Sequence, residues 1–462
     1  MPRLLNFAFR LYQRILHSLA LYPTLIALGF FVLCLLSMSI EYQPWMMSLK
    51  GEIDVGLVRN ADNARLILGT LVGGILSLMV FSFSMVMVVL NNAAAALSPR
   101  VVPGLISDKS HQKTLGFYLG TILFSLLLIT TIELDNSTQV PSLGVLMALA
   151  MGIACLGLFV HFIHSISRSI QVEYILNNLY HTTLAKLAAR EAKLAAIDNL
   201  PSWPEDQNWQ EVCAQRSGYF KELNVNTINT ILCEHDLRMT VMIHRGFFVM
   251  SGRPLFKLDR QVDSAITDAL LDCFDFFLEE YAHSHYLFGC TQMSEIAVKA
   301  LSPGINDPGT AITAIDLLSV LFSKRLALPD LDVTLADDGP PRLLHYELSL
   351  DELLQRVFGP IRHYGCADVS VLIGLLQAFK NLLYQPLRAT QKTDLLRHVR
   401  SVQETADQHL CNSRDRQAIN QLLERINQNS SALEPIALLG IPGSKGAEDN
   451  TQQPSTSSRE AL

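Results

Sequence analysis

The sequence predicts a mainly α-helical fold, in which a four-span transmembrane helical domain is joined to a cytoplasmic helical domain with a small β-barrel-like module. Two observations predict this fold class. Of the 462 residues, 49% are hydrophobic and only 17% are charged, and the mean hydropathy is +0.26. The charge is also unevenly distributed along the chain. Residues 1–170 carry 10 Lys+Arg and 7 Asp+Glu, whereas residues 171–462 carry 26 Lys+Arg and 36 Asp+Glu. This balance disfavours intrinsic disorder, a disulfide scaffold and nucleic-acid binding.

Four long uncharged segments predict the membrane spans. The first, Leu19–Ile40, has 22 residues, enough for a helix across a hydrocarbon core of roughly 30 Å. A cleaved signal peptide is the alternative, but its apolar region would be shorter, about 7–15 residues. We therefore favour a retained helix. The other candidate spans are Leu66–Pro99, Thr114–Ile132 and Val140–Ile163.

The basic residues that flank these segments predict the topology. They lie before the first segment, between the second and third, and after the fourth: Arg3, Arg10, Arg14, Arg100, Lys109, Lys113 and Arg168. The loop 41–65 has three basic residues but four acidic ones, and the loop after Ile132 has acidic residues alone. Since cytoplasmic loops carry the excess of Lys and Arg, both termini are expected in the cytoplasm.

A polar residue recurs at every seventh position of the second span. This polar stripe consists of Thr70, Ser77, Ser84, Asn91 and Ser98. Residues seven positions apart differ by only about 20° around a helix axis, so these residues share one face. In the same span, Gly69 and Gly73 form a GxxxG motif. The stripe is interpreted either as a helix-packing surface, within the unit or between subunits, or as the lining of a pore in a homo-oligomer. Because Leu66–Pro99 contains no ionisable residue, a proton relay along it is disfavoured.

After the fourth span, the spacing of the apolar residues changes from helical to strand-like and then back to helical. A stalk helix is expected over 165–199, because apolar residues recur there at helical spacing without Gly or Pro. Short strand-like runs follow over 216–258, and an amphipathic helix is expected over Leu258–Tyr281. We expect further helices over 292–301, from the N-cap Asp307 and Pro308 to Ser323, and over 350–358, 368–384, 389–410 and 414–426, with a hairpin within 326–348.

These patterns divide the chain into five regions. They are a transmembrane domain (1–164), a stalk helix and linker (165–200), a small β-module (207–258), a cytoplasmic helical domain (259–430) and a disordered tail (440–462). The eight cysteines form no CxxC pair, so we interpret them as buried small hydrophobic residues. His161 and His164 share a helix face, but no third ligand lies near them in the sequence. Neither a metal nor a cofactor is therefore expected.

The run FGCTQMSEIAVKALSPGINDPGTA, Phe288–Ala311, resembles the hallmark of a bacterial family of predicted inner-membrane proteins, domain of unknown function 2254. The resemblance extends over roughly residues 10–430, through LSPR after the second span, LGFYLGT in the third and GFFVMSGRPL. It implies a multi-pass membrane protein with a cytoplasmic C-terminal region, and it implies no activity. The chain differs from the family pattern just upstream, where it has Tyr281, His283 and His285 instead of an Arg-Thr pair and an Asp.

The SPGINDPGTA loop offers hydroxyl, amide and carboxylate groups beside a helix N-terminus, from Ser302, Asn306, Asp307 and Thr310. Such groups suit an anion or a metal-bound ligand, but each also has a folding role as a turn or cap residue. The sequence has no GxSxG, HExxH, P-loop or GxGxxG motif. On the basis of the polar stripe in the second span, we expect an oligomeric channel or transport-type protein with a cytoplasmic regulatory domain. The alternatives are a sensor or scaffold that binds a ligand or partner at this loop and, less favoured, a membrane-anchored enzyme.

Overall fold

The computed structural model describes most of the chain as two compact units, Met1–Ile175 and Leu176–Leu462. The described residues are 21–41, 43, 58, 60–96, 109–132, 140–169, 171–195, 203, 206–277, 285–334, 341–430 and 435–441. Ser98, His283 and most of the expected tail lie outside these ranges. We call the two parts the four-helix unit and the C-terminal unit.

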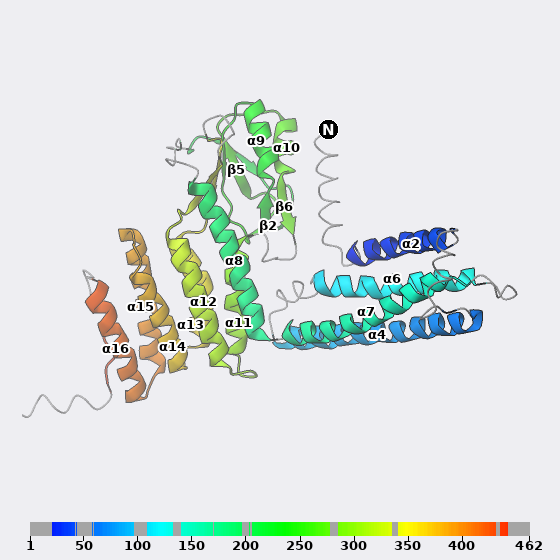
Figure 1. Ribbon diagram of the computed structural model, residues 1–462. Coiled ribbons are helices and arrows are strands. Elements are labelled where there is room, and N and C mark those ends of the chain that lie inside the picture. Colours follow the sequence, from blue (N-terminus) through cyan, green and yellow to red (C-terminus); the bar gives the residue numbers. More distant parts are fainter. Residues whose placement is uncertain are drawn as a thin grey trace, which may run out of the picture. The chain divides into compact units, whose positions relative to one another are not determined.

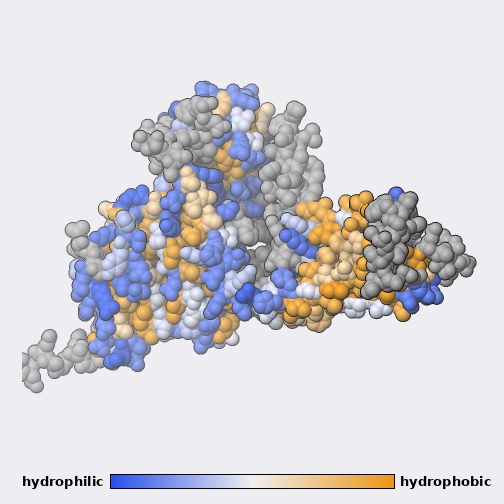
Figure 2. Space-filling view, in the orientation of Figure 1, coloured by the Kyte–Doolittle hydropathy of each residue, from blue (hydrophilic) through white to orange (hydrophobic). Residues whose placement is uncertain are grey.

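The four-helix unit consists of four helices in its described residues (Figure 1): α2 (Leu21–Glu41), α4 (Ala61–Ala96), α6 (Lys109–Thr131) and α7 (Ser142–Ser169). All four are long and apolar enough to cross a membrane, which confirms the four expected spans. Apolar residues also dominate the surface of this unit, whereas the visible surface of the C-terminal unit is largely hydrophilic (Figure 2). Hydrophobic side chains on the outside of a helical bundle are what a lipid environment requires.

Helix α6 is the most buried of the four spans. Half of the residues in its 18-residue apolar segment are buried, against 17% in the corresponding segments of α2 and α4. Two glycines allow α2 to approach it closely. A Cβ atom on Gly116 would lie 2.9 Å from the Cα atom of Pro23, and one on Gly120 would lie 2.6 Å from the ring of Phe30. Helix α4 lies at the edge of the unit and leaves much of its own surface uncovered.

The expected stalk is two helices rather than one. Helix α7 continues to Ser169, and α8 (Val172–Ala195) begins after a break. In the C-terminal unit the side chains of Leu176, Leu179 and Leu187 on α8 are buried. The segment therefore does not stand alone as a stalk, because its apolar face packs into the core of that unit.

Two small open sheets form the β-structure of the described residues, and neither closes into a barrel. The strands are β1 (Gln210–Cys213), β2 (Gly218–Leu223), β3 (Met239–Val241), β4 (Phe248–Val249), β5 (Pro254–Leu258), β6 (Phe274–Phe277), β7 (Leu331–Thr334) and β8 (Leu343–Tyr346). One sheet has the order β1-β5-β3-β8-β7 and the other β4-β2-β6. Strand β8 pairs with β3 in parallel, with Thr240 opposite Leu344.

The structure corrects two expectations in this region. The helix expected over 258–281 is wrong, because within the described residues 258–277 only α10 (Ser264–Leu271) is helical and β6 follows it. The reason lies in Phe274, Phe276 and their neighbours, which pair with β2 and complete the second sheet. The strand-like region also contains a helix that was not expected, α9 (Val225–Glu234), capped by the side chain of Asn224.

Helices make up the rest of the C-terminal unit: α11 (Tyr286–Ala300), α12 (Pro308–Leu326), α13 (Leu350–Tyr364), α14 (Val369–Leu383), α15 (Ala389–His409) and α16 (Ser413–Ser430). The expected hairpin within 326–348 is confirmed by the antiparallel pairing of β7 with β8. The expected N-cap is confirmed too, since the Asp307 side chain accepts a hydrogen bond from the backbone N–H of Thr310 and Pro308 opens α12. Helix α13 begins with a capping box of Ser349 and Glu352.

Candidate functional site

The polar stripe of α4 faces away from the rest of the four-helix unit. Four of its five members, Thr70, Ser77, Ser84 and Asn91, are exposed. Gly69 and Gly73 also lie on the open surface, where a Cβ atom would meet no other atom within 4 Å. The stripe and the GxxxG motif therefore do not pack against the other helices that the structure describes in this unit.

The hydroxyl groups of the stripe use the backbone of their own helix. Thr70 Oγ1 donates to the carbonyl of Leu66 at 2.7 Å, and Ser77 Oγ donates to the carbonyl of Gly73 at 2.9 Å. Large apolar side chains flank the stripe on the same exposed surface: Leu66, Leu76, Val80, Phe81, Phe83, Met87 and Val88. A polar centre with apolar margins is typical of a helix-contact surface in a membrane.

The SPGINDPGTA loop is exposed, and its side chains stabilise the turn between α11 and α12. The carboxylate of Asp307 accepts from the backbone N–H and the hydroxyl of Thr310, at 3.1 and 2.6 Å, and these bonds hold the pKa of Asp307 below its usual value. Asn306 has a φ of +49°, a left-handed conformation that Asn tolerates. Ser302 Oγ donates to the carbonyl of Lys299. The loop thus brings the four predicted residues into one turn, where Asp307 and Thr310 bond to each other and Ser302 bonds to the last turn of α11.

A buried polar cluster that the sequence did not reveal lies in the C-terminal unit. It joins α8, α11 and α12 to the ends of β3 and β8, and its members are Arg190, Arg245, His285, Tyr286, Arg325, Asp330, His345 and Glu347. At its centre the Tyr286 hydroxyl accepts from Arg190 Nη1 and from Arg325 Nε, each at 3.1 Å. Arg325, only 2% exposed, also forms a 2.6 Å ion pair with Asp330.

The second half of the cluster surrounds Glu347. This buried carboxylate pairs with Arg245, and its Oε2 lies 3.4 Å from Nε2 of His285. Burial would raise the pKa of Glu347, but His285 and Arg245 hold it well below its usual range. Burial lowers the pKa of His285, and it lowers the pKa of His345 to about 3. Near neutral pH Glu347 is therefore ionised and both rings are neutral.

The arrangement of the cluster suits stabilisation better than catalysis. His285 Nδ1 accepts from the N–H of Leu287 and caps α11, so its Nε2 proton points to Glu347. His345 Nε2 lies 2.9 Å from the carbonyl of Ile243 and ties β8 to the segment that follows β3. The contacts of His285 with Glu347 and of His345 with Ile243 each link two elements that are distant in sequence. Together with the Arg245–Glu347 ion pair they hold the sheet against the helices.

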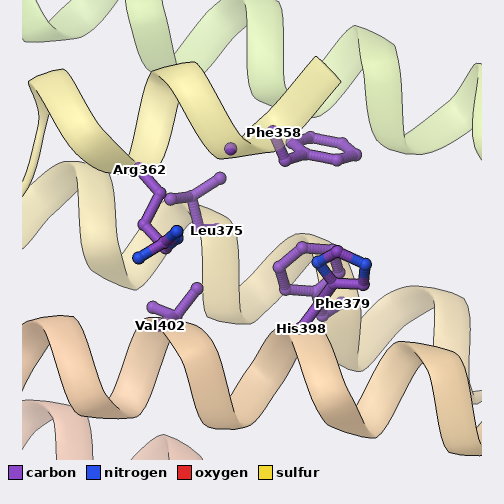
Figure 3. A pocket seen from close by; sticks show the side chains of 7 residues that line it. Phe358, Arg362, Leu375, Phe379, His398 and Val402 are labelled. Atoms are coloured by element: carbon purple, nitrogen blue, oxygen red, sulfur yellow. The ribbon is translucent and has the colours of Figure 1, made fainter. Parts of the chain in front are cut away.

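A small pocket lies between α13, α14 and α15 (Figure 3). Apolar side chains form most of it, and Phe379 stacks on His398. Its polar groups have protein partners, because Arg362 donates to Thr405 Oγ1 at 2.7 Å and His398 Nε2 lies 3.1 Å from Asp351 Oδ1. The pocket is therefore a packing feature of the helical core.

The described cysteines and histidines do not form a metal site. No group of three or more His, Cys, Asp or Glu residues within the described ranges could hold a metal ion. His161 and His164 are exposed on α7. The expectation that the cysteines are buried is wrong for three of them, since Cys213, Cys233 and Cys411 are exposed.

Comparison with known proteins places the chain in a family. An uncharacterized protein of Mycobacterium bovis and two of Mycobacterium tuberculosis are each 26% identical to it over 345 residues. The match covers 71% of this chain and 66% of each relative, so the chain spans just under two thirds of the length of the curated relatives it matches. No solved structure matches the chain significantly. The family described as "Predicted membrane protein (DUF2254)" matches residues 17–381, and the chain, a multi-pass membrane protein, belongs to this family.

Proposed function

We propose that this membrane protein assembles through α4 into a homo-oligomer that acts as a channel or transport-type protein. The observation that carries the proposal is the exposure of the polar stripe on the outer face of α4. In lipid, hydroxyl and amide groups on a helix surface are costly unless protein or water covers them. Thr70 and Ser77 lower this cost by bonding to their own helix, but the Asn91 amide has four hydrogen-bonding sites, which a single helix does not satisfy.

A second copy of α4 is the partner that fits this surface. Gly69 and Gly73 allow two helix backbones to approach closely, and the flanking Leu76, Val80 and Phe83 supply apolar contact area. When several copies surround one axis, the polar stripe faces that axis and the apolar margins face the neighbouring copies. Water along the axis then satisfies the polar groups, and a polar path crosses the membrane.

The direction of the chain in the membrane is part of the proposal. The basic residues before α2, between α4 and α6, and at Arg168 support an inner-membrane topology with both termini in the cytoplasm. In this topology the C-terminal unit lies in the cytoplasm, where it regulates the path.

Flux measurements on reconstituted protein test the channel. We expect wild-type protein in liposomes to release K⁺ or Cl⁻, and we expect Ser84→Leu and Asn91→Leu to reduce the release sharply, since leucine removes polar groups from the path. Val160→Leu is the matched control, because Val160 is 69% exposed on α7, away from the stripe. Unchanged flux in both stripe variants, or no flux of either ion from the wild type, would contradict the proposal.

A further inference from the structure

The segment around β4 gathers exposed apolar side chains. Ten large apolar residues are exposed among the described residues of the C-terminal unit, and four of them lie within 242–250. Phe248 and Met250 are 48% and 68% exposed, while Val249 between them is buried. Since side chains alternate along an extended chain, Phe248 and Met250 share one face. The ring of Tyr219, opposite Phe248 in the β2–β4 pairing, lies edge-on to the Phe248 ring at a centroid distance of 5.2 Å. Exposed apolar side chains that cluster in this way mark a contact surface.

Two loops lie side by side at this end of the sheet, 214–217 between β1 and β2 and 250–253 between β4 and β5. The backbone N–H of Gly252 donates to the carbonyl of Ala214, and the N–H of Ala214 donates to the carbonyl of Arg253, each at 2.8 Å. Gly252 has a φ of +88°, a conformation that favours glycine. These bonds fix the shape of both loops, so the exposure of their side chains is a feature of the fold.

Basic side chains accompany the apolar ones. Arg216 and Arg253 are exposed, one in each loop. The segments 212–221 and 237–258 contain six Lys and Arg residues and no Asp or Glu, whereas the chain after the fourth span carries a net negative charge. We call the following five residues the apolar–basic tip: Arg216, Tyr219, Phe248, Met250 and Arg253.

A lipid bilayer with anionic headgroups fits the apolar–basic tip better than a protein does. A stable protein interface takes roughly 20–30 residues on each side, and the tip has five. A bilayer needs fewer, because a few apolar side chains enter the boundary of the acyl chains while basic side chains attract anionic headgroups. Asp268 accepts from Gln215 Nε2 at 3.0 Å beside the first loop, but the two arginines outnumber it, and the tip stays positive.

The chain itself keeps this surface within reach of a bilayer. Helix α7, a membrane span, ends at Ser169, and α8 begins at Val172 and leads into the C-terminal unit. A surface that is tethered by so short a link meets the bilayer at an effective concentration on the order of millimolar. Weak contacts of a few side chains are then enough to hold it there.

We propose that the apolar–basic tip docks the C-terminal unit onto the surface of the lipid bilayer, with its arginines at anionic headgroups and with Phe248 and Met250 in the apolar layer below them. The unit then has two attachments to the membrane, its covalent link to α7 and the tip. The tip is separate from the outer face of α4, and the docking does not depend on the channel.

Quenching of tryptophan fluorescence in the full chain, reconstituted in nanodiscs, tests the docking. Met250→Trp places a reporter in the tip, and lipids with a nitroxide label near the headgroup quench the reporter only if it enters the bilayer. We expect more quenching than in the wild type, whose own tryptophans give the background, and a larger excess with phosphatidylglycerol than with phosphatidylcholine. Tyr364→Trp is the matched control, because Tyr364 is 56% exposed at the end of α13, outside the tip. It should add no quenching.

A charge reversal tests the role of the arginines. In the Met250→Trp chain, the pair Arg216→Glu and Arg253→Glu should remove the excess quenching on phosphatidylglycerol, and an unchanged Tm shows that the fold is kept. No excess from Met250→Trp, an equal excess from Tyr364→Trp, or an excess that survives the charge reversal would overturn the docking. Acrylamide, a quencher in the water, reveals a protein partner: a reporter that is shielded from acrylamide but not quenched by the lipid label is covered by protein, and this result also overturns the docking. None of these results depends on whether the liposomes conduct.

Discussion

His285 Nε2 lies 3.4 Å from Oε2 of Glu347, where α11 meets the end of β8, and Glu347 is buried while His285 is mostly buried. This pair joins two parts of the chain that are 62 positions apart (285 and 347). Together with Arg245 it connects the parallel β3–β8 pairing to the first turn of a core helix. The stability of the C-terminal unit therefore depends on the protonation state of a few buried groups.

Stability of the C-terminal unit should fall as the pH is lowered from 7 to 5. Burial lowers the pKa of His285, His345 and His398 from the ordinary value of 6.5. Below about pH 6.5 the unfolded chain takes up protons at these rings while the folded chain resists, so the free energy of unfolding decreases. Tryptophan fluorescence can follow the transition, since Trp203 and Trp209 lie in this unit.

The substitution His285→Asn isolates one of these contributions. Asn keeps a side-chain oxygen for the N–H of Leu287 at the N-cap of α11, but it does not titrate. We expect a shallower decrease between pH 7 and 5 than in the wild type. Identical pH profiles for the two proteins would show that His285 does not contribute.

Removing the carboxylate of Asp330 should destabilise the C-terminal unit. Asp330→Asn leaves the buried guanidinium of Arg325 without its ionised partner. Loss of a fully buried ionised partner would lower the free energy of unfolding by about 3–5 kcal/mol. Because Asp330 is 43% exposed, we expect denaturant unfolding to show a smaller decrease, roughly 2 kcal/mol. Asp236→Asn, at an exposed ion pair with Arg342, is the control and should change stability much less.

The contact between α8 and α11 requires a glycine. A Cβ atom on Gly289 would lie 1.9 Å from Oγ1 and 3.1 Å from Cβ of Thr183, so Gly289→Ala should lower the Tm of this unit strongly. Thr183→Ala removes the nearest atom and should restore part of the loss in the double variant. If Gly289→Ala alone leaves the Tm unchanged, the packing of α8 against α11 is wrong.

The SPGINDPGTA loop can be tested by comparing two substitutions of Asp307. Asp307→Asn keeps an oxygen for the N–H of Thr310, so stability should stay within about 1 kcal/mol of the wild type, while Asp307→Ala should cost about 1 kcal/mol or more. Equal losses would show that the carboxylate charge, and not the cap, matters for folding. A divalent cation such as Mg²⁺ that stabilises the wild type but not Asp307→Asn would instead favour a ligand role, because the substitution removes the carboxylate that would bind it.

Local patterns in the sequence predicted the spans and several boundaries. An uncharged run long enough for a bilayer needs no tertiary information, and the Asp307-Pro308 pair is a capping signal within two residues. The apolar spacing over 258–281 wrongly predicted a helix, because Phe274 and Phe276 lie in a strand, β6. The partner of that strand, β2, lies some 50 residues earlier in the chain. A helical period and a short strand cannot be told apart there without the sheet.

The buried polar cluster was beyond sequence reasoning for the same reason. Arg325 has the position of an ordinary basic residue in the last turn of α12, and Glu347 follows an unremarkable strand. Only the parallel pairing of β3 with β8 brings Arg245 to Glu347, across 102 positions. The Tyr286 and His285 pair beside the family motif was the one available signal, since charged or hydrogen-bonding side chains near a buried helix start need partners.

Disulfide cross-linking in native membranes tests most directly whether copies of this protein meet at α4. Ser77 lies at the centre of the exposed polar stripe, and Val160 is an exposed position on α7. We predict that Ser77→Cys forms a disulfide-linked dimer on mild oxidation, in excess of any formed by the wild type, and that Val160→Cys does not. No dimer from Ser77→Cys, or as much from Val160→Cys, would contradict assembly through α4 and remove the basis for the channel.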